Sequence, residues 1–101
     1  MDPERISDFN IADVVRSTAG RDEGKLFYVI GTDPVYLLLA NGKDRTLDKP
    51  KRKKRKHIQK VLRSETRVAE KLRLGDKVLN SELRRDLAYL SKELQSTNLG
   101  G

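Results

Sequence analysis

The sequence predicts a mainly β fold, a small five-stranded β-barrel followed by a helical extension. Residues 11–62 hold about five short stretches rich in apolar or β-branched residues, separated by turn residues, and such a set typically closes into a barrel without free strand edges. After residue 62 the apolar spacing becomes helical. We therefore expect four parts, namely a flexible lead-in at 1–10, the barrel at 11–62, a helical extension at 63–95 and a disordered tail at 96–101.

The first three strands are predicted from apolar stretches that alternate with turns. The first is 11–17 (IADVVRS), and the glycines at both ends of 20–24 indicate a turn after it. The second is 25–31 (KLFYVIG), which is rich in aromatic and β-branched residues. We expect one ring of Phe27 and Tyr28 in the core and the other exposed, because they occupy opposite faces. A turn at 32–34 then precedes the third strand, 35–40 (VYLLLA).

Two more strands complete the predicted barrel. Asn41-Gly42 is a strong hairpin signal, so 43–48 (KDRTLD) is expected to return as the fourth strand, with Leu47 as its apolar contact. After a run of basic residues, 57–62 (HIQKVL) is expected as the fifth strand. Ile58 and Leu62 should point to the same face if that strand is regular.

Helical patterns follow the predicted barrel. Residues 65–75 can form a short helix that ends at Gly75, and 80–95 can form a longer one capped by Asn80 or Ser81. In the longer helix four leucines are spaced by 4, 3 and 4 residues, which places them on one stripe, namely Leu83, Leu87, Leu90 and Leu94. We expect this stripe to pack against the barrel or the short helix, and a short dimer seam is the alternative.

Charge is distributed unevenly along the 101 residues, whose net charge is +7. Residues 1–50 carry 7 Lys or Arg against 9 Asp or Glu, whereas residues 51–101 carry 15 against 6. This asymmetry indicates a polyanionic partner, either nucleic acid or an anionic membrane. The chain has no cysteine, which excludes disulfides and thiolate metal sites. Its N-terminal stretch is polar and acidic, and no apolar run approaches about 20 residues, so we expect a cytoplasmic protein.

The segment 17–27 (STAGRDEGKLF) invites comparison with a phosphate-binding nucleotide loop. Three residues, not four, separate the first glycine from Gly-Lys, and Leu26 stands where Ser or Thr would hold Mg²⁺. The following residues are β-like, whereas a nucleotide loop leads into a helix, and Asp22 and Glu23 would repel phosphates. The segment is therefore predicted to be a turn between two strands.

The basic run, residues 49–56 (KPKRKKRK), is the strongest functional feature. Seven of its eight residues are cationic, so neither face of an extended chain could be buried, and counterion release from a phosphate backbone is its natural interaction. A solvated loop or a localisation tag is the alternative. A membrane-surface role would require an amphipathic helix beside the charges, and no such segment adjoins the run. Further cations flank it, namely Lys43, Arg45, Lys60, Arg63 and Arg67.

No constellation of residues indicates catalysis. His57 is the only histidine, and beside six cations it is a poor general base, although its ring can contact phosphate or stack on a base. We find neither paired carboxylates with a distinctive spacing nor a metal-binding cluster, and we expect no cofactor. Aromatic residues are scarce, which favours recognition of structured RNA through its backbone and shape over reading of single strands.

The stretch DVVRSTAGRDEGKLFYVIG is followed by a predicted hairpin and then by KPKRKKRKHIQ. This order resembles the KOW-motif domains of the large-subunit ribosomal protein type, and most of all bacterial KOW-domain RNA-binding proteins related to archaeal and eukaryotic large-subunit ribosomal proteins. The resemblance covers about residues 13–59 and implies a Src-homology-3-like β-barrel that binds ribosomal or similar structured RNA without catalysis. Carried over by position, it implies that Gly20 and Gly24 shape the turn. It also implies that Arg21 and Lys25 near the turn, and residues 51–56 with His57, approach RNA. Residues 63–101 lie outside it.

We therefore expect a non-enzymatic RNA-binding protein, with ribosomal RNA and possibly the large ribosomal subunit as its partner. The predicted RNA-binding residues are Arg21, Lys25, Lys43, Arg45, Lys51, Arg52, Lys53, Lys54, Arg55, Lys56 and His57. One alternative is a DNA-binding protein, although no recognition helix is visible in the sequence. Another is a protein-interaction module that uses the leucine stripe as its docking face.

Overall fold

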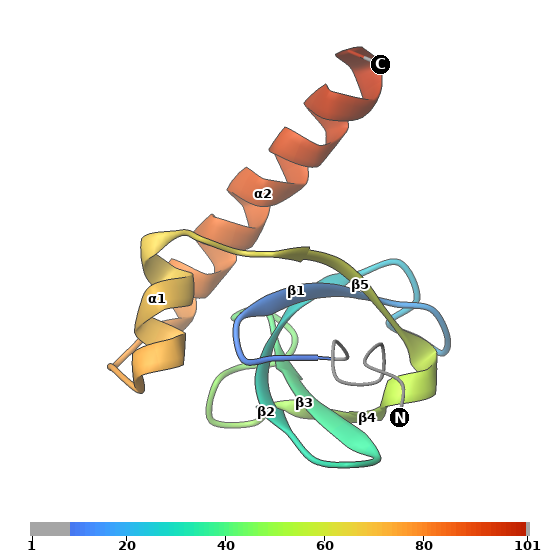
Figure 1. Ribbon diagram of the computed structural model, residues 1–101, viewed down its shortest axis with the longest axis vertical. Coiled ribbons are helices and arrows are strands. Elements are labelled where there is room, and N and C mark those ends of the chain that lie inside the picture. Colours follow the sequence, from blue (N-terminus) through green and yellow to red (C-terminus); the bar gives the residue numbers. More distant parts are fainter. Residues whose placement is uncertain (1–8, 101) are drawn as a thin grey trace, which may run out of the picture.

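The computed structural model of the protein describes residues 9–100, and the side chains of residues 9–95. Residues 1–8, most of the expected flexible lead-in, lie outside the described residues. Five strands form one antiparallel sheet with the spatial order β4-β3-β2-β1-β5 (Figure 1). The strands are β1 (Asp13–Ser17), β2 (Leu26–Thr32), β3 (Tyr36–Ala40), β4 (Lys51–Lys54) and β5 (Ile58–Arg63). Four of the five predicted strands are thereby confirmed.

The sheet is strongly curved but open. Its hydrogen-bonded ladder ends at β4 on one side and at β5 on the other. The short 3₁₀ helix η2 (Arg55–His57) connects these two edge strands (Figure 1). Next to η2, the backbone N–H of Thr18 donates to the carbonyl of His57 at 2.9 Å. The mainly β class is confirmed, while the closed barrel that we expected is not shown.

The predicted fourth strand, residues 43–48, is wrong, because these residues form a loop. The side-chain oxygen of Asn41 accepts hydrogen bonds from the backbone N–H groups of Lys43 and Arg45, at 2.9 and 3.0 Å. Of the two residues Asn41 and Gly42, only Gly42 takes a positive φ, of 78°. The two-residue hairpin turn expected there needs a positive φ at both residues, so it does not form. The returning strand is β4, which lies within the basic run.

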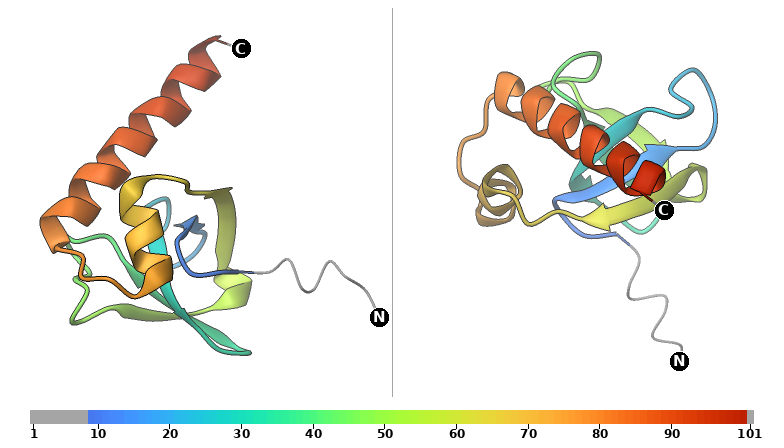
Figure 2. Two further views of the ribbon diagram at one scale, coloured as in Figure 1. Left: turned by 60° about the vertical axis from the view of Figure 1, so that its left-hand side comes forward. Right: turned by 90° about the horizontal axis from the view of Figure 1, so that it is seen from above.

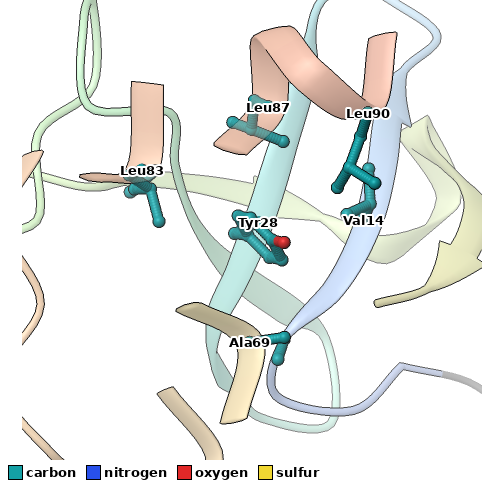
Figure 3. Packing of buried hydrophobic residues seen from close by; sticks show 8 residues of the cluster. Val14, Tyr28, Ala69, Leu83, Leu87 and Leu90 are labelled. Carbon is teal, nitrogen blue, oxygen red and sulfur yellow. The ribbon is translucent and has the colours of Figure 1, made fainter. Parts of the chain in front are cut away.

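The two faces of the sheet bury different clusters. The inner face of the curve holds Val15, Phe27, Val29, Leu37, Leu39 and Ile58. On the outer face of β1 and β2, Val14 and Tyr28 pack against the C-terminal helices (Figure 3). Because both faces are covered, Phe27 and Tyr28 are each 0% exposed, and the prediction that one of these rings is exposed is wrong.

Strand β5 changes face along its length. Val14 pairs with Leu62 and Val15 with Lys60, so β5 contains one extra residue at this point, a β-bulge. Ile58 therefore lies in the inner cluster, whereas Leu62 packs on the outer one. Our expectation that these two side chains share a face is wrong, because the bulge reverses the alternation.

Both helices form close to their predicted positions and cover the outer face. Helix α1 (Arg67–Leu74) is capped by the side chain of Thr66 and ends at Gly75, which has a left-handed backbone. Helix α2 (Asn80–Gly100) extends past residue 95, where we expected the helix to end, and projects beyond the sheet (Figure 2). Three stripe leucines, Leu83, Leu87 and Leu90, are buried between α2 and the sheet (Figure 3), which confirms the predicted packing for these three. The fourth, Leu94, is half-buried.

Asn80 has a different role from the expected helix cap. It is the first residue of α2, and its side-chain oxygen accepts a hydrogen bond from the backbone N–H of Leu47 at 2.8 Å. Arg84, one turn later, donates to the carbonyl of Gly42 at 2.7 Å. Helix α2 thereby fixes the loop that leads into the basic run.

Candidate nucleic-acid interface

Strand β4 and η2 place the basic run at one edge of the sheet. Lys54 pairs with Tyr36 and Arg52 with Leu38, so these four side chains share the outer face. Lys51 and Lys53 pair with core-facing leucines and are half-buried at the rim, whereas Arg52, Lys54 and Lys56 are exposed. No residue from 51 to 57 is buried, so the prediction that neither face of the basic run could be buried is confirmed.

Neutral groups position several of these cations. The guanidinium of Arg52 lies 3.6 Å from the centroid of the Tyr36 ring. Lys53 Nζ donates to the carbonyl of Ala19 at 2.7 Å, and Arg55 Nε donates to the carbonyl of Asp33 at 2.9 Å. A ring or a carbonyl directs a cation without neutralising it, so at Arg52 and Lys53 the positive charge remains available to an anion.

Ion pairs distinguish the basic run from other cations of the protein. Within residues 9–95, Lys51, Arg52, Lys53, Lys54 and Lys56 form no ion pair with a carboxylate. Elsewhere, Lys60 pairs with Asp13 at 3.2 Å and Lys71 with Glu82 at 2.9 Å. Arg63 and Arg73 both pair with Glu65. The five cations of β4 and η2 named first thus concentrate positive charge that has no carboxylate ion-pair partner in the described part of the chain.

One acidic residue of the turn at 20–24, Asp22, forms ion pairs with cations of the protein itself. Lys25 Nζ contacts Asp44 at 2.6 Å and Asp22 at 3.6 Å, and Arg45 contacts Asp22 at 3.5 Å. The hydrogen bond to Asp44 raises the pKa of Lys25, and the same bond lowers the pKa of Asp44. Of the cations predicted around this turn, Lys25 and Arg45 are therefore engaged by carboxylates.

Arg21 and Lys43 are exposed. The turn also lies beside the basic run, because Lys53 donates to Ala19 and a side chain at Gly20 would approach Lys53 Nζ to 3.3 Å. His57 is half-buried, and its carbonyl accepts from Thr18. The structure thus brings together two segments whose contacting residues lie about 35 positions apart in the sequence.

Tyr36 was not among the residues predicted at the interface. Its position opposite the basic run follows from the pairing of β3 with β4, and that pairing depends on the loop conformation of residues 43–48. One pattern in the sequence could have indicated Tyr36. Tyr36 and Leu38 alternate with the core residues Leu37 and Leu39, so Tyr36 and Leu38 lie on the outer face.

Other kinds of site find no support in the described part of the chain. It contains no group of three or more His, Cys, Asp or Glu residues that could hold a metal ion. None of its helices combines the length and the apolar character that crossing a membrane requires. Comparison with models of known protein families gave no match, and comparison with curated proteins gave none either.

Proposed function

We propose that the protein is a non-catalytic RNA-binding protein, with the edge formed by β4 and η2 as its contact surface. The expected partner is a structured RNA such as ribosomal RNA of the large subunit. The observation that carries this proposal is the absence of ion pairs at Lys51, Arg52, Lys53, Lys54 and Lys56 within residues 9–95. Together with the sequence resemblance, it favours a phosphate backbone as the missing anion.

The energetics of such binding follow from counterion release. Each cation that replaces a condensed counterion on the RNA releases that ion into solution, which is favourable at low salt. A backbone held in a strand and a 3₁₀ turn fixes the spacing of these cations, so less conformational entropy is lost on binding than for a flexible tail. Phosphate contacts would position the protein, and RNA shape would supply most of the selectivity.

We also propose that the curved sheet is a Src-homology-3-like barrel of the KOW type. The resemblance of residues 13–59 supports this assignment, and five curved antiparallel strands are compatible with it. On this assignment the helical extension is an addition to the barrel. Its leucine stripe serves the protein's own core, since Leu83 is 0%, Leu87 6% and Leu90 8% exposed, and this burial disfavours the alternative of a docking module.

The proposal is tested with two double variants that remove the same number of positive charges. Lys54→Gln with Lys56→Gln alters the edge, whereas Lys77→Gln with Lys92→Gln alters exposed lysines of the helical extension. At about 0.1 M salt we expect the first variant to bind structured RNA roughly tenfold more weakly. We expect the second to bind nearly as well as the unchanged protein. Equal losses of RNA affinity in the two variants would show that binding depends on the net charge of the protein and not on the edge formed by β4 and η2.

Competition identifies the kind of nucleic acid. Structured RNA and duplex DNA of equal length are offered to the protein at one salt concentration, and we expect the RNA to displace the DNA. Preference for the DNA would overturn the proposal. Sedimentation of a cell lysate then tests the proposed partner, since the protein should travel with the large ribosomal subunit at low salt and leave it at high salt.

A further inference from the structure

A depression at the start of β3 adjoins the basic run. It is lined by Pro34, Val35, Lys54, Arg55 and Lys56. Val35 is 52% exposed, which makes it one of the most exposed large apolar side chains among those described. Its lining therefore combines an apolar part, the floor (Pro34 and Val35), with three cations.

The floor of the depression is held rigidly. The Asp33 carboxylate accepts hydrogen bonds from the backbone N–H groups of Val35 and Tyr36, at 2.8 and 2.7 Å. The backbone N–H of Arg55 donates to the carbonyl of Val35 at 3.0 Å. A surface fixed in this way loses little entropy when a ligand settles on it.

The cationic wall is also oriented. Arg55 Nε donates to the carbonyl of Asp33, and the Arg55 guanidinium lies 5.7 Å from the centroid of the Phe9 ring. Arginine planes held in this manner are surfaces on which RNA bases stack. Asp33 is the acidic residue next to the depression, and its oxygen Oδ1 is already bonded to the two backbone donors of the turn.

The ligand that fits this combination has a flat, partly apolar body flanked by negative charges. A phosphate alone gains nothing from contact with the apolar floor. A base-paired duplex keeps its bases inside the helix, where they cannot reach the depression. We propose that the depression receives one unstacked nucleobase, from a bulge or loop of the RNA, while Lys54 and Lys56 hold the phosphates on either side of it. This inference rests on the proposed RNA-binding function and names the structural class of RNA that the edge selects.

Three short RNAs test the inference. The first is a blunt duplex, the second is the same duplex with one bulged uridine, and the third carries an abasic ribose at the bulge. The abasic RNA retains the bend and the phosphates but lacks the base. Since contact with one base is worth roughly 1–3 kcal/mol, equivalent to about 5- to 150-fold in affinity, we expect the bulged duplex to bind at least about fivefold more tightly than the other two.

Two serine variants test whether the preference for the bulged duplex depends on the depression. Val35→Ser removes apolar surface from the depression, whereas Leu79→Ser is a matched control, because Leu79 is also 52% exposed but lies in the linker before α2. Both substitutions affect exposed side chains, so both proteins should fold, and thermal melting checks this. We expect Val35→Ser to lose most of the preference for the bulged duplex and Leu79→Ser to keep it.

The outcomes separate this inference from the function on which it rests. Salt-dependent binding of all three RNAs with equal affinity would overturn the nucleobase site and leave the RNA-binding proposal intact. A preference for the bulge that survives with the abasic RNA, or in Val35→Ser, would also overturn it. Failure to bind any of the RNAs, or tighter binding to an acidic peptide, would overturn both.

Discussion

Tyr28 in β2 donates a hydrogen bond from its hydroxyl group to the carboxylate of Asp86 in α2. The same hydroxyl lies 2.8 Å from Ser64 Oγ, and Asp86 also accepts from Thr66 Oγ1 at 2.8 Å. Because Thr66 caps α1, one buried ring of the sheet connects to both helices through polar groups. The helical extension is thus an integral part of the folded protein.

Tyr28→Phe is expected to destabilise the protein while leaving its shape unchanged. The substitution removes the donor to Asp86, and hydrogen bonds to charged groups contribute about 1.5–3 kcal/mol. We expect the free energy of unfolding to fall by roughly this amount, measured by urea denaturation. An unchanged free energy would show that the hydroxyl group contributes nothing to the docking of the helices.

The stability of the protein should depend on pH through the same residue. Burial and the hydrogen bond to Asp86 raise the pKa of Tyr28 from 10.0 to about 12. The folded state therefore favours the neutral phenol, so this contribution is complete below pH 10 and is lost as the pH rises from there through about 12. The difference between the unfolding free energies of the protein and Tyr28→Phe should narrow over this window. A constant difference would contradict the assigned pKa.

Gly42→Ala is expected to be far more damaging than Gly24→Ala. Both glycines have positive φ, of 78° and 89°, so alanine is strained by about 1–2 kcal/mol at either position. At Gly42 the added methyl group would also overlap the carbonyl oxygen of Asn80 in α2, whereas at Gly24 it would meet nothing within 4 Å. Thermal melting of the two variants should separate them clearly, and equal losses would mean that α2 does not pack on this loop.

Single lysine variants should show which cations contact RNA. Lys25→Gln is expected to change RNA affinity by less than about twofold, because Lys25 Nζ is already bonded to Asp44. Lys54→Gln should weaken binding by about threefold, since Lys54 has no carboxylate partner within residues 9–95. Fluorescence titration at one salt concentration measures both. A larger loss for Lys25→Gln would place the RNA on the turn at 20–24 instead.

Local patterns predicted most of the strands and both helices, but not the contacts between them. The loop at 43–48 departs from the expected strand because the Asn41 side chain accepts hydrogen bonds from two backbone N–H groups of this loop. The presence of one asparagine in a sequence does not show which backbone donors its side chain will bind. The burial of Tyr28 depends on helices α1 and α2, which begin about 40 and 50 residues later. The spacing of leucines predicted that α2 has an apolar face without indicating which face of the sheet it covers.

The sequence predicted the cations of the candidate site better than it predicted which of them form ion pairs with carboxylates. Six consecutive cations at 51–56 are visible in the sequence. Which cations are compensated is decided by tertiary pairs such as Asp22 with Arg45, which lie 23 residues apart. Likewise, the stacking of Arg52 on Tyr36 requires the register of β3 with β4.

The salt dependence of RNA affinity shows whether the protein binds RNA through phosphate contacts. The dissociation constant for a structured RNA is measured between about 50 and 400 mM monovalent salt. If about four to six phosphates are contacted, the logarithm of affinity should fall against the logarithm of salt concentration with a slope of roughly −3 to −5. In Lys54→Gln with Lys56→Gln the slope should become shallower by about one to two. An affinity that does not change with salt would contradict the account.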